Sequence, residues 1–314
     1  MRILITGGAG FIGSNIADAY LQQGHEVFII DNLSTGKAEN IGPKAKLFKA
    51  DICDEGVRDI FKECRFDVVN HHAAQIDVRK SVANPVLDAR VNILGSLNLL
   101  QNCIQYGVKK IIFASTGGAI YGEQEEFPAT ESHPTNPLSP YGAAKLSVEH
   151  YLFFYGQVYG LNSTILRYAN VYGPRQAPHG EAGVVAIFAQ KLLRGEQPVI
   201  NGDGMQTRDF VYVGDVAKAN VLALSQLSTH NSQLPTIFNI GTGKETTIKQ
   251  LFKELVNSTG AGFKEKYGPH KSGEQKRSVI NFTKANKILG WSPQVSLEHG
   301  IRKTVDYFRD KPVI

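Results

Sequence analysis

The chain begins Met1-Arg2-Ile3-Leu4-Ile5-Thr6-Gly7-Gly8-Ala9-Gly10-Phe11-Ile12-Gly13, in which an apolar run meets a turn with glycines three residues apart. The apolar run predicts a buried strand, and Ile12, Ile16 and Ala19 continue as the apolar face of a helix. Glycines at this spacing let the chain turn sharply and let backbone amides approach a pyrophosphate, which the positive end of the helix favours. The stretch therefore predicts a dinucleotide-binding site.

A second apolar run extends from Glu26 to Ile30 and ends in Asp31. An acidic residue at this distance from the glycines is typical of a strand end that binds the adenosine ribose of a dinucleotide. Because a carboxylate repels a 2′-phosphate, Asp31 favours NAD over NADP as the cofactor.

Apolar runs alternate with helical stretches through position 159, which is typical of a parallel sheet covered by helices. The strands are expected at residues 2–6, 26–30, 46–50, 67–70 and 109–114. Loops rich in glycine and proline follow at 172–209, with later strand-like runs at 210–213 and 237–240 that return to the sheet and helices near 246–258 and 296–309. We therefore expect an α/β fold with two parts. These are a Rossmann domain with a doubly wound parallel sheet over 1–171, including returning segments near 210–240, and a smaller C-terminal mixed α/β substrate lobe over 172–209 and 241–314.

Composition and charge narrow the function classes. The 314 residues include 34 lysines and arginines and 29 acidic residues, a net charge of +5 with no dense basic run, which argues against nucleic-acid binding. No apolar run approaches the roughly 18 residues needed to cross a membrane, and the first residues form a core strand, so we expect neither a membrane span nor a secretion signal.

Cys53, Cys64 and Cys103 lack disulfide or metal spacing, as expected for a cytoplasmic protein. His71 and His72 are adjacent and point to opposite faces of a strand, so we expect no metal site.

Two hydroxyls and a tyrosine–lysine pair are the candidates for chemistry. Ser115 and Thr116 end the fifth strand, at the carboxyl edge where parallel sheets bind ligands. Tyr141 and Lys145 lie four residues apart at the start of a helix, on one face. Lowering a tyrosine pKa from about 10 to about 7 takes roughly 4 kcal/mol of phenolate stabilisation, which a neighbouring ammonium and an oxidised nicotinamide can provide. The pattern predicts that Tyr141 is a general base.

With these and further motifs, the chain resembles the extended short-chain dehydrogenase/reductase family, and within it the nucleotide-sugar epimerases of the UDP-glucose 4-epimerase type, over nearly all of its length. The motifs are Thr6-Gly7-Gly8-Ala9-Gly10-Phe11-Ile12-Gly13, Asp31-Asn32-Leu33-Ser34-Thr35-Gly36, Asp51-Ile52, His72-Ala73-Ala74, Tyr141-x-x-x-Lys145, Arg167-Tyr168-Ala169-Asn170-Val171-Tyr172-Gly173-Pro174-Arg175 and Gly202-Asp203-Gly204-x-Gln206-x-Arg208-Asp209-Phe210. The resemblance implies NAD as cofactor, bound by Gly7, Gly10, Phe11, Ile12, Gly13, Asp31, Asn32, Ser34, Thr35, Gly36, Lys37, Asp51, Ile52, Ala73, Ala74, Gln75, Asn92, Ser115, Tyr141, Lys145 and Tyr168.

The resemblance also implies a reaction on a UDP-sugar. Tyr141 would take the proton of the sugar 4′-hydroxyl while C4 gives its hydride to NAD. The resulting 4-keto sugar would turn over and take the hydride back on its other face, interconverting UDP-glucose and UDP-galactose. The residues implied to contact the substrate are Thr116, Tyr141, Asn170, Arg208, Lys271, Arg277 and Ser278.

The catalytic hydroxyl has two candidates. The family spacing from this hydroxyl to a Tyr-Gly pair is four residues, whereas Thr116 lies five residues before Tyr121. Thr116 fits if Gly117-Gly118 contains a one-residue insertion, and Ser115 is the alternative.

The diphosphate anchor also has two candidates, Lys271 and Arg277. A lysine lacks the bidentate phosphate geometry of an arginine. If Lys271 is nevertheless the anchor, family spacing makes Ser278 the residue that limits the group at sugar C2. Ser278 is small enough to admit an N-acetyl group, so activity on UDP-GlcNAc and UDP-GalNAc is also expected.

Related reactions are the alternatives. Sugar-nucleotide 4,6-dehydratases, including those acting on dTDP-sugars, carry Asp-Glu after the catalytic threonine, where this chain has Gly117-Gly118. A UDP-glucuronate 4-epimerase or decarboxylase stays open because Arg175 could receive a sugar carboxylate. A non-enzymic NAD-sensing protein on the same fold is the alternative from another class.

Two helices near 85–106 and 139–159 carry more apolar surface than one buried face requires. Residues 151–155, Tyr-Leu-Phe-Phe-Tyr, surround the second helix almost completely. We expect this surface to pair with a second copy of the chain as a two-fold homodimer, and the alternative is a central helix packed on two sides within one subunit.

Overall fold

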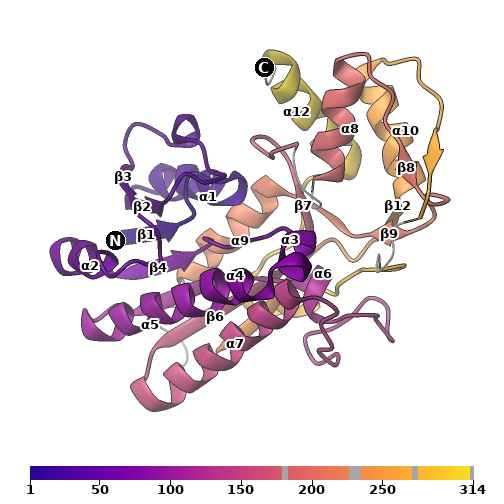
Figure 1. The fold of residues 1–314 in the computed structure, drawn as a ribbon. Helices are drawn as coiled ribbons and strands as arrows, with labels where there is room; N and C mark the ends of the chain where they lie inside the picture. Colours follow the sequence, from indigo (N-terminus) through magenta and orange to yellow (C-terminus); the bar gives the residue numbers. More distant parts are fainter. Residues whose placement is uncertain (179–182, 226–234, 271–274, 312–314) are drawn as a thin grey trace.

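The computed structural model describes residues 1–178, 183–225, 235–270 and 275–311. At its centre is a parallel sheet of seven strands in the order β11-β6-β5-β4-β1-β2-β3 (Figure 1). The strands are β1 (Arg2–Thr6), β2 (Glu26–Asp31), β3 (Lys46–Lys49), β4 (Val68–His71), β5 (Lys110–Thr116), β6 (Asn162–Tyr168) and β11 (Thr236–Ile240). Strand order runs outward in opposite directions from β1 and β4, which confirms the doubly wound Rossmann topology and places its ligand-binding switch point at their carboxyl ends.

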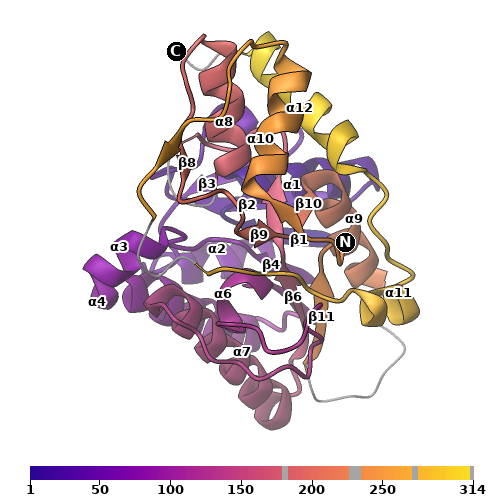
Figure 2. The same cartoon turned by 90° about the vertical axis from the view of Figure 1, so that its right-hand side faces the viewer.

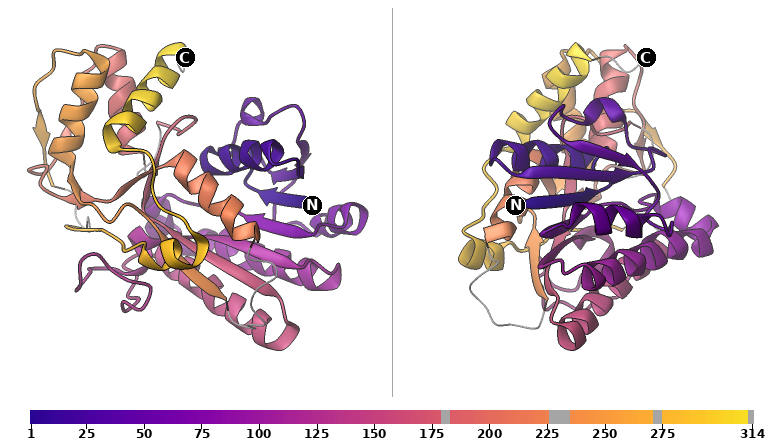
Figure 3. Two further views of the ribbon diagram at one scale, coloured as in Figure 1. Left: turned by 180° about the vertical axis from the view of Figure 1, so that it is seen from behind. Right: turned by 90° about the vertical axis from the view of Figure 1, so that its left-hand side faces the viewer.

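Both faces of the sheet are buried, and β1 shows how. Ile3 and Ile5 point to one face, where they join a cluster with α1, α9 and α11, whereas Leu4 points to the other and joins α2, α5 and α7. A strand that is buried on both faces has apolar residues at successive positions, which is why β1 could be predicted from the sequence. The helices are α1 (Phe11–Gln22), α9 (Val213–Ser225), α11 (Thr283–Leu289), α2 (Val57–Cys64), α5 (Gly95–Gln105) and α7 (Pro140–Tyr159). In Figure 3, α9 lies beside α1.

A third buried cluster lies apart from the sheet and is built mainly by three helices, α8 (Val184–Leu193), α10 (Ile248–Thr259) and α12 (Leu297–Asp310). These helices pack on one another through residues such as Phe188, Phe252 and Phe308, and they stand together in Figures 1 and 2. Three short strand pairs lie outside the main sheet: β7 (Asn170–Tyr172) with β10 (Phe210–Tyr212), β9 (Thr207–Arg208) with β12 (Thr246–Thr247), and β8 (Ile200–Asn201) with β13 (Tyr267–Gly268).

Two expectations about the later chain need correction. The run at 210–213 does not return to the main sheet, because β10 pairs with β7 after the chain has left β6. The run at 237–240 does return, as β11 beside β6. The segment from Ala285 to Trp291, expected in the substrate lobe, packs in the cluster on the sheet face instead. The domain boundaries themselves stay a prediction.

The region expected as one helix near 85–106 is built in steps. It begins with α3 (Val78–Ala83) and α4 (Pro85–Ala89), where Asn84 Oδ1 accepts a hydrogen bond from Leu87 N and Pro85 occupies the first turn. A π-helical turn at Arg90–Leu94 then leads into α5. Such wide turns occur often at functional sites. The remaining short elements are a 3-10 turn at Ala38–Asn40 and α6 (Gly117–Ile120). Within the described ranges, no helix has the length and apolar character required to cross a membrane.

Candidate active site

The glycine turn between β1 and α1 is closed tightly against its neighbours. Gly7 has a φ of 69°, and a Cβ there would lie 2.6 Å from Ala73 N. A Cβ on Gly13 would overlap the Gly7 carbonyl oxygen. Gly10, by contrast, has only the Gly7 carbonyl oxygen near its Cβ position, at 3.2 Å, and no side chain caps the first amides of α1. The turn therefore offers backbone donors without a side-chain cap to a pyrophosphate and has no side chain within 4 Å of the Gly10 Cβ position.

Asp31 at the end of β2 is tied to this turn. Its Oδ2 accepts from Ala9 N at 2.9 Å, and its Oδ1 accepts from Leu33 N at 2.8 Å. Gly36 packs so closely on the carboxylate that a Cβ would lie 2.9 Å from both oxygens. The predicted ribose-binding acid thus lies directly beside the predicted pyrophosphate site.

The residues predicted to surround the adenosine lie together next to Asp31. Asn32 Nδ2 donates to Asp51 Oδ2 at 2.8 Å, and Ser34 N donates to Asn32 Oδ1 at 3.0 Å. Ile52 is buried behind Asp51. Lys37 N donates to Ala9 O at 3.0 Å, which brings the segment through Thr35 and Gly36 back to the glycine turn.

The loop after β4, which carries Ala73 to Gln75, is joined to the glycine turn by a chain of buried hydrogen bonds. Ser96 Oγ donates its single hydrogen to Asn92 O at 2.6 Å. It must therefore be the acceptor in its hydrogen bond with His71 Nε2, at 2.8 Å. His71 Nδ1 then accepts from Thr6 Oγ1 at 2.7 Å, and Thr6 Oγ1 accepts from Ala73 N at 3.2 Å. Burial lowers the pKa of His71 well below its usual value, which keeps the ring neutral as this chain requires.

His72 points away from His71, as the sequence predicted. Its Nε2 lies 3.1 Å from Tyr168 OH, and the two rings stack with centroids 5.9 Å apart. Tyr168 OH also accepts from Asn220 Nδ2 at 2.9 Å, a partner on α9 that sequence reasoning missed. Burial lowers the pKa of His72 to about 3, so this ring is neutral too. The described residues include no cluster of histidine, cysteine or carboxylate side chains that could hold a metal.

Tyr141 and Lys145 lie on one face of α7, at the carboxyl end of β5. Lys145 Nζ donates to Ala114 O at 3.0 Å and lies 6.0 Å from the centroid of the Tyr141 ring and 4.7 Å from that of Phe113. Burial lowers the pKa of Lys145 to about 8. Burial also raises the pKa of Tyr141 above its usual value, and the Asp88 carboxylate adds to this effect. In the polypeptide alone, burial and Asp88 are the causes of the Tyr141 pKa shift, so the acidification of Tyr141 by Lys145 and an oxidised nicotinamide stays a prediction for the site with cofactor bound.

Ser115 and Thr116 point in opposite directions because they are neighbours on a strand. Ser115 Oγ donates to the buried Glu149 Oε1 at 2.6 Å. Thr116 Oγ1 instead accepts from Ala119 N at 3.2 Å. Thr116 Oγ1 and Asn170 Oδ1 both lie 3.9 Å from the Cβ position of Gly118, so Thr116 and Asn170 lie on the same side of Gly118. The geometry favours Thr116 over Ser115 as the hydroxyl that reaches a ligand.

Behind β5 lies a buried ion pair that the sequence analysis did not identify. Arg167 Nη2 and Nε bind the two Glu149 oxygens at 2.5 and 3.0 Å, and both side chains are 4% exposed. Arg167 Nη1 donates to Tyr121 OH at 3.0 Å, and Tyr121 OH donates to Asn239 Oδ1 at 2.7 Å. Glu149 follows Lys145 by four residues, one helical turn, which is the one sequence signal that could have indicated it.

The candidate phosphate-binding arginines come from adjacent segments. Arg208 lies in β9, and Thr207 N donates to Lys276 O at 2.9 Å, directly before Arg277. Glu245 binds the Arg277 guanidinium at 2.9 and 2.7 Å and accepts from Thr207 Oγ1 at 2.6 Å. The Arg277 guanidinium also lies 3.6 Å from the centroid of the Phe127 ring. The structure therefore brings Arg277 beside Arg208, whereas Lys271 lies outside the described residues.

The segment after Arg277 runs into the protein. Ser278 is 3% exposed, and Ile280 forms a bridge with Ala129. Asp209, which follows Arg208, accepts from Thr242 N and Oγ1 at 2.8 and 2.6 Å and from Gly243 N at 3.1 Å. Asp209 thus holds the 241–243 turn beside β9.

Arg175 forms its ion pair with α1, not with Thr116 or Asn170. Its Nη2 lies 2.6 Å from Asp18 Oδ2 on α1, and Asn15 Nδ2 donates to the neighbouring Pro174 O at 3.3 Å. These contacts fasten the loop after β7 to the first Rossmann helix. Whether Arg175 receives a sugar carboxylate stays a prediction.

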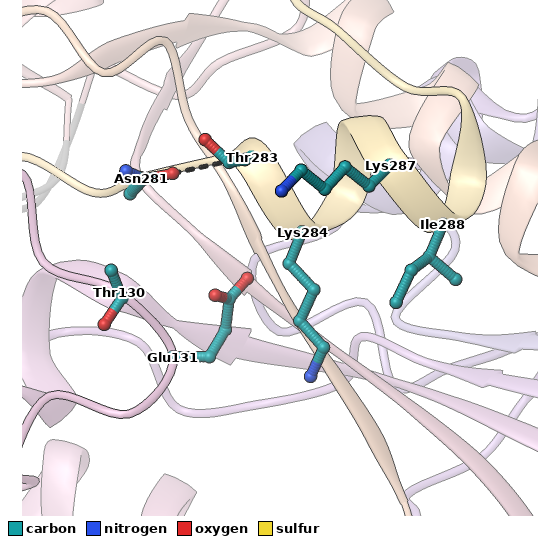
Figure 4. Close-up of a pocket in the computed structure, with 7 residues that line it drawn as sticks. All are labelled: Thr130, Glu131, Asn281, Thr283, Lys284, Lys287 and Ile288. Carbon is teal, nitrogen blue, oxygen red and sulfur yellow. Dashed lines mark hydrogen bonds between the residues drawn. The ribbon is translucent and has the colours of Figure 1, made fainter.

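A surface pocket of about 370 Å³ shares no residue with this site. In Figure 4, Glu131 and Lys284 project into it from opposite walls. Glu131 Oε1 accepts from Asn239 N at 2.8 Å, so this side chain covers the edge of β11. The pocket therefore has a structural explanation and is not the candidate active site.

Comparisons with known proteins agree with this geometry. The model of the NAD dependent epimerase/dehydratase family matches residues 3–241. A putative UDP-glucose 4-epimerase of Methanocaldococcus jannaschii is 47% identical over 308 residues, covering 98% of each chain. The crystal structure of a Thermotoga maritima UDP-glucose 4-epimerase with UDP-glucose is 52% identical, covers 99% of each chain and has a TM-score of 0.95. That of a Thermus thermophilus UDP-glucose 4-epimerase in complex with NAD is 49% identical, covers 99% of this chain and 100% of that chain, and has a TM-score of 0.92.

Proposed function

The chain belongs to the NAD-dependent epimerase/dehydratase family, and on that basis we propose that it is an isomerase that interconverts UDP-glucose and UDP-galactose. The observation that carries the proposal is the placement of Tyr141 and Lys145 at the carboxyl end of β5, with the Thr116 hydroxyl on the same open side as Asn170. Gly118 supports an epimerase over a dehydratase, because this position has no carboxylate that could act in the elimination of water.

NAD fits the residues present at the switch point. The uncapped amides of Phe11 and Ile12, with the space over Gly10, would hold the pyrophosphate, and Asp31 would accept hydrogen bonds from the adenosine ribose. Ala73 to Gln75 would flank the phosphates, and Tyr168 would lie toward the nicotinamide end. When bound, NAD supplies a reversible hydride acceptor for the sugar C4.

The protein's own groups then move one proton. Tyr141 Oη takes the proton of the sugar 4′-hydroxyl and returns it after the sugar has presented its other face. The Thr116 hydroxyl hydrogen-bonds the same sugar oxygen and shortens the path of that proton. Lys145, anchored by the Ala114 carbonyl, keeps a positive charge near the phenolate as it forms.

The UDP part must stay in place while the sugar turns. We infer that Arg208 and Arg277 bind the diphosphate, with Glu245 orienting the Arg277 guanidinium. Asn170 would contact the sugar. If Lys271 is the anchor instead, the small and buried Ser278 becomes the residue that limits the group at sugar C2, and a further activity on UDP-GlcNAc and UDP-GalNAc is proposed for that case.

The function is tested by incubating the protein separately with UDP-glucose, UDP-GlcNAc and UDP-glucuronate, with and without added NAD, and identifying the products by NMR. We expect UDP-galactose from UDP-glucose, inversion at C4 alone, and no net rise of reduced-nicotinamide absorbance. A dehydrated 4-keto product, or turnover of UDP-glucuronate in the absence of turnover of UDP-glucose, would refute the proposal.

The two candidate hydroxyls give a testable contrast. Thr116→Ala should lower kcat for UDP-glucose by about 10- to 100-fold, because it removes a hydrogen bond to the reacting oxygen. Ser115→Ala should leave kcat close to the wild-type value and act on stability, since Ser115 faces Glu149. The measurement is kcat and the thermal midpoint for both variants. The reverse pattern would assign catalysis to Ser115.

We propose that the protein is a homodimer through α4 and α7. Exposed apolar side chains gather on these neighbouring helices, with Val86 78% and Phe153 51% exposed. Figure 1 shows α4, α5 and α7 side by side along one face. Exposed apolar surface of this kind marks an interaction site, and two copies related by a two-fold axis would cover it.

A charge placed on this face should separate the two copies. Val86→Glu combined with Phe153→Glu is expected to convert a dimer into a monomer in analytical ultracentrifugation, because it buries uncompensated charge at the interface. Met205→Glu, at an apolar position that is 57% exposed and lies outside α4 and α7, is the control and should stay dimeric. A wild-type protein that sediments as a monomer, or a double variant that stays dimeric, would contradict the proposal.

We also propose a cytoplasmic location. Cys53, Cys64 and Cys103 are free thiols, and the latter two are buried. Free cysteines suit a compartment that keeps thiols reduced.

A further inference from the structure

Asp88 is a buried carboxylate that the reaction above does not use. It lies on α4 and is 1% exposed. Its Oδ1 accepts from Gln75 Nε2 and from Asn92 Nδ2, both at 2.9 Å. Its Oδ2 is buried and has no hydrogen-bond partner among the described residues. A buried carboxylate oxygen without a partner is costly, so its retention calls for an explanation.

The Asp88 charge acts on the catalytic pair. α4 packs against α7, which carries Tyr141 and Lys145. For Tyr141, burial raises the pKa and Asp88 raises it further. For Lys145, burial lowers the pKa to about 8, while Asp88 and then Glu149 oppose that decrease. Asp88 therefore disfavours the phenolate and favours the ammonium, which is the expected action of a nearby negative charge on both groups.

The other charged or titratable groups around the pair are balanced or neutral. Glu149, one turn further along α7, is bound by Arg167 and by Ser115. On the β4 side, His71 and His72 have lowered pKa values and are neutral at pH 7.

From β6, burial raises the pKa of Tyr168, whose OH is bound by Asn220. Of the two carboxylates that act on Lys145, Glu149 is paired with Arg167, whereas the described residues show no ion pair for Asp88.

Asp88 also connects the pair to the loop after β4. Asn92, in the π-helical turn, accepts from Gln75 N and donates to Gln75 O, each at 2.9 Å. The same Asn92 amide donates to Asp88, and Gln75 does so through its side chain. Asp88 thus lies where the predicted phosphate loop meets the catalytic helix.

We propose that Asp88 is a positioning residue: held by Gln75 and Asn92, its charge sets the pH range in which Tyr141 and Lys145 act together. This role rests on the proposed epimerase function. The carboxylate keeps Lys145 protonated inside a buried site and holds Tyr141 protonated until cofactor and substrate bind. Asp88 itself exchanges no proton with the substrate.

The test is the pH profile of kcat for UDP-glucose in the wild type and in Asp88→Asn. Removing the negative charge should lower the pKa of both Tyr141 and Lys145. Both the acidic and the basic limb of a bell-shaped profile should therefore move to lower pH, by about one unit. A role limited to folding would lower the plateau and leave both limbs in place.

The matched control is Asp77→Asn, which removes a carboxylate at the start of α3, two residues after Gln75. Asp77 Oδ1 caps α3 by accepting from Arg79 N at 2.9 Å, a bond that asparagine can keep. Both limbs of the pH profile of Asp77→Asn should coincide with those of the wild type. If Asp88→Asn does not fold, as judged by circular dichroism, Asp88→Ser removes the same charge with a smaller side chain and takes its place.

The outcomes separate the two proposals. A wild type without epimerase activity refutes the function itself. A wild type with activity and an Asp88 variant with unmoved limbs refutes the role of Asp88 alone, as does a shift of either limb to higher pH.

Discussion

Tyr141→Phe is expected to lower kcat for UDP-glucose about 1,000-fold, a loss typical of removing a positioned general acid–base. The substitution removes only the hydroxyl and keeps the ring that lies 6.0 Å from Lys145 Nζ. NAD should still bind, because the amides of α1 and the Asp31 carboxylate do not depend on this hydroxyl. The measurements are kcat by NMR detection of UDP-galactose and the NAD content of the purified variant.

Tyr155→Phe is the matched control for this experiment. Tyr155 lies on the same helix, but its hydroxyl accepts from Gln101 Nε2 at 2.9 Å on the side of α5. Its removal should leave kcat near the wild-type value. Retained turnover in Tyr141→Phe would refute the assignment of Tyr141, and loss of NAD together with turnover would point to a binding role instead.

Glu149→Leu is expected to lower the free energy of unfolding by about 3–5 kcal/mol, because it leaves the Arg167 guanidinium buried without its partner. Both side chains are 4% exposed, so water cannot replace the lost carboxylate. Ser115 loses its acceptor in the same step. Denaturant unfolding followed by circular dichroism measures the effect, with the slope checked against that of the wild type.

Two further variants show whether the buried charge is the cause. Glu149→Leu combined with Arg167→Met removes both charges and should recover much of the lost stability, since apolar pairs of similar volume often replace a buried ion pair well. Glu298→Leu breaks an exposed pair with Arg302 on α12 and should change stability little. Equal losses in the single and double variants would show that packing, not the unpaired guanidinium, is responsible.

The parts of the site that could be read from the sequence are those formed within one strand, turn or helix. Gly7, Gly10 and Gly13 are close along the chain, so their spacing specifies the turn that they form. Tyr141 and Lys145 share a helix face because four residues complete about one turn. In both cases short-range geometry determines which groups lie together.

The sequence could not decide between groups whose partners are distant along the chain. Ser115 and Thr116 are equivalent as residue types, and only the contact of Ser115 with Glu149, 34 residues later, separates them. The run at 210–213 has the composition of a sheet strand, yet its partner is β7. Lys271 and Arg277 stay the two anchor candidates, and only the pairing of Thr207 N with Lys276 O shows that Arg277 lies next to the Arg208 segment.

The sequence by itself thus determined the Rossmann fold, the dinucleotide turn and the Tyr141–Lys145 pair, since apolar periodicity and local spacing encode them. Only the tertiary structure decided the direction of the Tyr141 pKa shift and the place of Asp88. Both depend on burial and on charges brought together from α4 and α7, and these are properties of packing between segments that no local pattern records.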